Sequence, residues 1–124
     1  MMRSKFYLYL APLLCFMSLN VYAEYKTSGE MTPQEYQKVR ESSAEYNECL
    51  NETAISQLHL QADTRVIADH AMKECATHLE NLYNFLLLGN YPPESMKRFV
   101  NSISNKSANK LLSNVMRYKA AQSQ

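Results

Sequence analysis

Residues suited to a buried helix face recur every three or four positions along three stretches of the chain, the spacing of one side of an α-helix. The first stretch begins at Thr32, where a threonine, a proline and a glutamate at position 35 form a typical helix N-terminus. Its expected buried face consists of Tyr36, Val39, Ser43, Tyr46, Leu50, Ala54 and Leu58. The spacing predicts a helix that runs to about His59.

The second stretch follows a polar break at residues 61–63, where Asp63 is suited to cap a helix. Its expected buried face consists of Val66, Ile67, Ala71, Cys75, Leu79, Leu82, Tyr83 and Leu86. Gly89 then provides a C-terminal stop, and the prolines of residues 90–93 prevent the helix from continuing. A third amphipathic pattern runs from Met96 to Met116, with a weak point at residues 104–108 where an interruption could fall.

One cysteine lies in each of the first two predicted helices, at equal distances from the break between them. Cys49 is 13 residues before position 62, and Cys75 is 13 residues after it. Both arms of a helical hairpin rise about 1.5 Å per residue, so the two side chains should lie opposite each other. We predict a Cys49–Cys75 disulfide with a structural role, because the chain has no Cys-x-x-Cys motif to lower a thiol pKa.

These elements predict an all-α fold: an antiparallel helical hairpin stapled by one disulfide, with the third amphipathic helix packed on it. Two helices alone would each bury only one stripe, so the third completes a core. We expect a single domain over residues 32–119, a flexible leader at 24–31 and a frayed end at 120–124.

Residues 1–23 have the layout of a cleaved secretory signal. Arg3 and Lys5 precede a 14-residue apolar run, and Val21-Tyr22-Ala23 supplies small residues near the cleavage point. The run is shorter than the roughly 20 residues of a membrane-spanning helix. We therefore expect a periplasmic or secreted protein, in a compartment where disulfides persist. Whether a bacterium or a eukaryote exports it stays open.

Charge is unevenly distributed along the expected mature chain. Residues 24–94 contain 12 acidic and five basic side chains, which leaves a net charge of −7, whereas residues 95–124 contain six bases and no acid. Four glutamates form an acidic row on the first helix: Glu41, Glu45, Glu48 and Glu52. Neighbouring like charges are mildly destabilising, so we expect the third helix to place Lys106, Lys110 and Arg117 near this row. The candidate partner-binding residues are these seven together with Tyr91 and Tyr118.

One side of the second helix carries three possible metal ligands, spaced four residues apart: His70, Glu74 and His78. Side chains at this spacing could share a zinc or copper ion. No fourth ligand is evident, so metal binding is only a weak alternative and we expect no cofactor. Asn51 and Asn105 begin Asn-x-Ser/Thr patterns for glycosylation, but both fall within or near predicted helices.

The favoured function is non-catalytic binding of another protein, as an accessory factor, inhibitor, immunity protein or chaperone. The alternative is peripheral membrane binding, because a basic amphipathic helix can lie on an anionic lipid surface. The sequence singles out neither a nucleophile with a neighbouring base nor a carboxylate pair across a cleft, so we do not expect an enzyme. Nucleic acid binding is not expected either, because the charge of the mature chain is nearly balanced.

Overall fold

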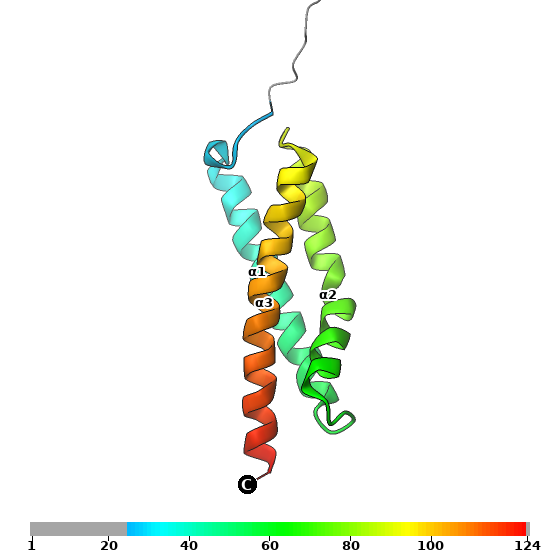
Figure 1. The fold of residues 1–124 in the computed structure, drawn as a ribbon. Helices are drawn as coiled ribbons and strands as arrows, with labels where there is room; N and C mark the ends of the chain where they lie inside the picture. The colour runs from blue at the N-terminus through cyan, green and yellow to red at the C-terminus, as the bar shows by residue number, and fades with distance from the viewer. Residues whose placement is uncertain (1–24, 124) are drawn as a thin grey trace, which may run out of the picture.

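The computed structural model describes residues 25–123, so the predicted signal at 1–23 lies outside the described residues. The elements are a 3-10 turn, η1 (Ser28–Glu30), and three α-helices, α1 (Pro33–Gln57), α2 (Thr64–Leu87) and α3 (Pro93–Gln122). Helices α1 and α2 form an antiparallel hairpin, and α3 lies along it and runs antiparallel to α2 (Figure 1). No strand occurs in this part of the chain. The all-α class and the predicted arrangement are confirmed.

The caps of the first two helices form as predicted. The backbone amide of Glu35 donates to Oγ1 of Thr32 at 3.1 Å, and that hydroxyl donates to Oε1 of Glu35, also at 3.1 Å. At the start of α2, Oδ1 of Asp63 accepts from the amide of Arg65 at 2.9 Å. The contacts of the Glu35 and Arg65 amides each satisfy a backbone N–H in the first turn that has no partner within its own helix. The two helix starts are therefore determined by residues close in sequence.

The disulfide joins Cys49 and Cys75, whose Cα atoms lie 5.9 Å apart. This confirms the pairing of positions at equal distances from the break. The turn between the helices covers the short segment between Gln57 and Thr64, as the polar break predicted. The disulfide thus links the C-terminal half of α1 to the middle of α2, and Cys75 is buried in the core.

The buried face of α1 differs from the predicted one at its N-terminal end. Its buried residues recur at strict four-residue intervals: Ser42, Tyr46, Leu50 and Ala54, followed by the cap residue Leu58. Four residues turn through about 400°, so this face moves around the helix by about 40° per step. By the first turn it has moved away from Tyr36, which is 45% exposed. The prediction that Tyr36 belongs to the buried face is therefore wrong. The same prediction for Val66, at the start of α2, is also wrong, because Val66 is 45% exposed.

Helix α3 is continuous, and it is docked on the hairpin. The interruption considered at residues 104–108 does not occur, and Ser107 in this stretch is buried. Met96, Val100, Leu111 and Val115 complete the core against α2 and α1. Packing of this face overrides the weaker helix propensity of serine and asparagine. Among residues 25–123, no helix is both long and apolar enough to cross a membrane.

Candidate functional site

The acidic row of α1, formed by Glu41, Glu45, Glu48 and Glu52, is exposed along its whole length. The side chain of Glu45 is 63% exposed, and its Oε2 lies 3.7 Å from Nδ1 of His78 on α2. This is the only contact of ion-pair distance within residues 25–123. Because His78 belongs to α2, the contact places the acidic row beside the α1–α2 edge of the bundle. The row faces solvent, and its one ion-pair partner in this part of the chain, His78, is charged only when protonated.

Helix α3 meets α1 along a different edge. Nδ2 of Asn114 donates to Oδ1 of Asn51 at 3.4 Å, and Nζ of Lys119 donates to the backbone oxygen of Leu58. Asn51 lies about 120° around α1 from Glu45 and is three residues from Glu48, a spacing that makes Asn51 and Glu48 neighbours on the helix surface. The α3 contact therefore adjoins the side of α1 that carries the acidic row.

The three cations expected near the acidic row do not pair with it. Lys106, Lys110 and Arg117 are exposed on α3, and in the described part of the chain no ion pair joins them to α1. Instead, Nη2 of Arg117 donates to Oδ1 of Asn114 at 2.6 Å. The ion pairs are therefore absent among residues 25–123, although Asn114, which Arg117 contacts, reaches Asn51 beside Glu52. The acidic row and the basic side chains of α3 do not neutralise each other through direct contact in this part of the chain.

The two candidate tyrosines are not equally accessible. Tyr91 is 1% exposed and belongs to the core, so it cannot contact a partner in this conformation. Tyr118 is half-buried and packs against the core from α3. A position in a turn suggested exposure for Tyr91, but the turn at 90–93 folds over the end of the bundle. Tyr91 is therefore removed from the candidate surface.

Tyr91 is instead half of a buried acid–phenol pair with Glu35. Oε2 of Glu35 and the hydroxyl of Tyr91 are both buried, and neither makes a hydrogen bond of normal geometry within residues 25–123. The nearby phenol lowers the pKa of Glu35, the contacts with Thr32 act in the same direction, and burial opposes them. Burial, followed by the Glu35 carboxylate, raises the pKa of Tyr91 to about 12.

The segment before α1 closes over this pair. The amide of Lys26 donates to the backbone oxygen of Asn90 at 2.9 Å, and its Nζ lies 5.9 Å from the centroid of the Tyr91 ring. Met31, just before the Thr32 cap, is buried in the core. Part of the segment expected to be a leader therefore contributes to the end of the bundle.

Other sequence candidates lack supporting geometry. Within the described residues, no group of three or more His, Cys, Asp and Glu side chains could hold a metal ion. The trio His70, Glu74 and His78 therefore does not form a site of this kind. The side-chain Nδ2 of Asn51 donates to the backbone oxygen of Asn47 at 3.0 Å, and its Oδ1 accepts from Asn114 on α3. The side chain of this glycosylation candidate is therefore engaged in packing.

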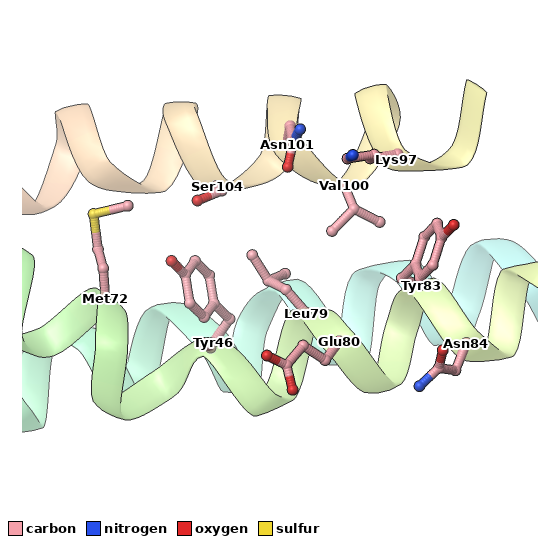
Figure 2. A pocket seen from close by; sticks show the side chains of 11 residues that line it. Tyr46, Met72, Leu79, Glu80, Tyr83, Asn84, Lys97, Val100, Asn101 and Ser104 are labelled. Atoms are coloured by element: carbon pink, nitrogen blue, oxygen red, sulfur yellow. The ribbon is translucent and has the colours of Figure 1, made fainter. Parts of the chain in front are cut away.

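A groove between α2 and α3 is a feature that the sequence patterns did not reveal. It has a volume of about 600 Å³ and is lined by eleven residues, ten of them from these two helices. Leu79, Val100 and the ring of Tyr83 lie between the helices, and Tyr46 of α1 lies between Leu79 and Met72 (Figure 2). The apolar stripes did indicate Leu79 and Val100, but the opening between them depends on how α3 is seated.

Comparison with known proteins adds no family assignment: no family model matches the chain, and no curated protein or solved structure matches it significantly. Functional inference therefore depends on the geometry of the two charged surfaces and the groove.

Proposed function

We propose that this chain is an exported, non-catalytic protein that binds another protein through the acidic row of α1. The observation that carries the proposal is that these four glutamates are exposed and that, within residues 25–123, no basic side chain of α3 forms an ion pair with them. In the same part of the chain, His78 is their one ion-pair partner.

Electrostatics indicates what kind of partner would bind here. Adjacent carboxylates on one helix face repel each other, at a cost of a few tenths of a kcal/mol per pair. A basic protein surface would relieve this repulsion and accelerate association through long-range attraction. The expected partner is therefore a protein with a cluster of lysine or arginine side chains, acting with this chain as an accessory factor, inhibitor, immunity protein or chaperone.

Export is part of the same proposal. The Cys49–Cys75 disulfide suits an oxidising compartment, and the basic and apolar start of the chain suits a secretory signal. Periplasmic or extracellular location follows from these two features together. Mass spectrometry of the chain recovered from its own cell envelope or medium tests it: an N-terminus at Glu24 supports export, and retention of residues 1–23 contradicts it.

Quantitative capture tests the surface. The oxidised chain from Glu24 to Gln124 serves as bait for its own envelope extract, beside an E45K/E48K variant and a D69K/E80K control that changes the charge equally on α2. We expect E45K/E48K to lose at least about 80% of the specifically captured protein, with an unchanged Tm, and the control to retain it. Equal capture by both variants, or equal loss in both, would overturn the assignment to the acidic row.

Peripheral membrane binding through α3 is a second candidate, favoured by its basic exposed face. Lys97, Arg98, Lys106, Lys110 and Arg117 are exposed, and no acid occurs after Glu94. The main apolar stripe of α3 is buried, although Met116 is 57% exposed, so binding would be mainly electrostatic. Sedimentation with anionic vesicles that falls as salt rises would support it. No sedimentation at low salt would exclude it.

A further inference from the structure

The groove between α2 and α3 has an apolar interior. Met72, Leu79 and Val100 contribute aliphatic or thioether surface, and Tyr83 contributes a ring (Figure 2). Its volume of about 600 Å³ is within the range of roughly 300–1,000 Å³ typical of small-molecule sites. From Met72 to Asn84 the α2 wall rises about 18 Å, which makes the groove elongated. An elongated apolar space of this kind suits an alkyl chain.

One buried polar group opens into this space. Tyr46 is 1% exposed, yet its hydroxyl points from α1 toward α3, beside Met72 and Ser104 (Figure 2). The hydroxyl oxygen is not one of the fully buried atoms that lack a partner in the described range, which leaves it within reach of water or a ligand in the groove. A phenol hydroxyl at such a position can donate a hydrogen bond to either. The groove therefore presents a hydrogen-bond donor from its floor.

The α3 rim supplies further donors in one row. Lys97, Asn101 and Ser104 follow the spacing of four and then three residues that aligns side chains on one helix face. Lys97 has no ion-pair partner within residues 25–123. In Figure 2 the Glu80 carboxylate lies over α2, across the groove from this row. An anion placed against α3 would thus meet an ammonium, an amide and a hydroxyl, with the one acid on the far rim.

We propose that this groove binds a free single-chain amphiphile with an anionic head, such as a fatty acid carboxylate. The head lies against Lys97 and Asn101, and the chain extends past Leu79 and Val100 toward Met72. The Tyr46 hydroxyl contacts the ligand or a water molecule that it holds. This site is distinct from the acidic row of α1, so the two proposals stand or fall separately.

Titration of the oxidised chain from Glu24 to Gln124 with dodecanoate, kept below its micelle concentration, tests the site. Calorimetry and NMR shifts of Tyr46 and Tyr83 are the measurements. We expect saturable one-to-one binding that weakens at least about fivefold in Lys97→Met, which removes the ammonium but keeps much of the side-chain length. Ala76→Leu, which fills a half-buried position in the groove, should reduce binding at least tenfold.

Controls separate the groove from general surface charge. Lys106→Met removes an exposed cation of the same helix away from the groove and should bind like the wild type. Circular dichroism verifies that each variant is folded. Failure to saturate, equal losses in the Lys97 and Lys106 variants, or equal affinity for a neutral amphiphile of the same chain length would each overturn the proposal.

Discussion

At Gly89, a Cβ atom would lie 2.7 Å from Cε2 of Tyr91 and 3.0 Å from Oε2 of Glu35. The ring of Tyr91 is buried and cannot move away at little cost. We therefore expect Gly89→Ala to lower the free energy of unfolding by about 1–3 kcal/mol, as in other overpacked sites. Urea denaturation measures this. In the control Gly29→Ala, the nearest atom is 3.9 Å from the new Cβ, and stability should be nearly unchanged. Equal stability of both variants would contradict the packing argument.

The position of Gly89 was predicted, but for a different reason. The sequence predicted only that the helix stops at Gly89, and the residue with a positive φ, of 64°, is the next one, Asn90. A glycine commonly follows a helix, so local reasoning finds the residue. The close approach of Tyr91 and Glu35 depends on the folded chain, so local reasoning misses why the side chain must be absent.

The Glu35–Tyr91 pair gives stability a dependence on pH at both extremes. The pKa of Glu35 is lowered from 4.5, so the unfolded chain takes up a proton first as pH falls, and stability declines below about pH 4.5. The pKa of Tyr91 is raised from 10 to about 12, so the unfolded chain loses its proton first and stability declines between pH 10 and 12. Urea unfolding across pH should show a smaller alkaline decline in Tyr91→Phe. Identical alkaline slopes would exclude Tyr91 as the cause.

At the scale of elements, the disulfide joins the C-terminal half of α1 to the middle of α2. Its 26-residue separation predicts that reduction lowers the free energy of unfolding by about 3–4 kcal/mol in the chain-entropy model. Urea unfolding of the chain from Glu24 to Gln124, with and without reductant, measures this difference. A Cys49→Ala/Cys75→Ala variant should match the reduced chain. Two alkylatable thiols in the unreduced protein would show that the bond is absent.

Periodicity and caps were sufficient to place the helices along the sequence, and the cysteines were sufficient to pair the first two. Thr32 and Asp63 act on amides two or three residues away, so their roles can be read locally. The exposure of Tyr36 could not be predicted locally, because the buried face of α1 moves steadily around the helix. The continuity of α3 could not be predicted locally either, because burial of Ser107 stabilises the helix more than its low helix propensity destabilises it.

At the scale of the whole molecule, the sequence identified the charged surfaces but not their relative placement. The acidic row follows from the spacing of the four glutamates on one helix. The way the row lies between its neighbours is known only from two contacts about 120° apart around α1, Glu45 with His78 and Asn51 with Asn114. The groove could not be predicted from the sequence, because its walls belong to α2 and α3, its floor includes Tyr46 of α1, and its shape depends on how all three helices pack.

Docking of α3 also decides between a cooperative bundle and a hairpin with a free basic helix. Leu111 is 2% exposed in the core, so Leu111→Ala should lower the free energy of unfolding by about 2–5 kcal/mol. Met116→Ala, at a 57% exposed position on the same helix, should change it by less than about 0.5 kcal/mol. Far-ultraviolet circular dichroism follows all three helices, and tyrosine fluorescence follows the packing around all tyrosines, including Tyr46 and Tyr91 in the core and Tyr118 on α3.

If α3 is integral to the core, the circular dichroism and fluorescence transitions of each variant have the same urea midpoint, because the domain unfolds as one unit. If α3 is an independent membrane-binding arm, Leu111→Ala produces an early step in which part of the helical signal is lost before the main transition, with the change in tyrosine fluorescence divided between the two steps. The first result would restrict any membrane contact to the exposed cations of α3. The second would free its apolar stripe, including Val100 and Val115, to enter a lipid surface, and would make the membrane the better functional proposal.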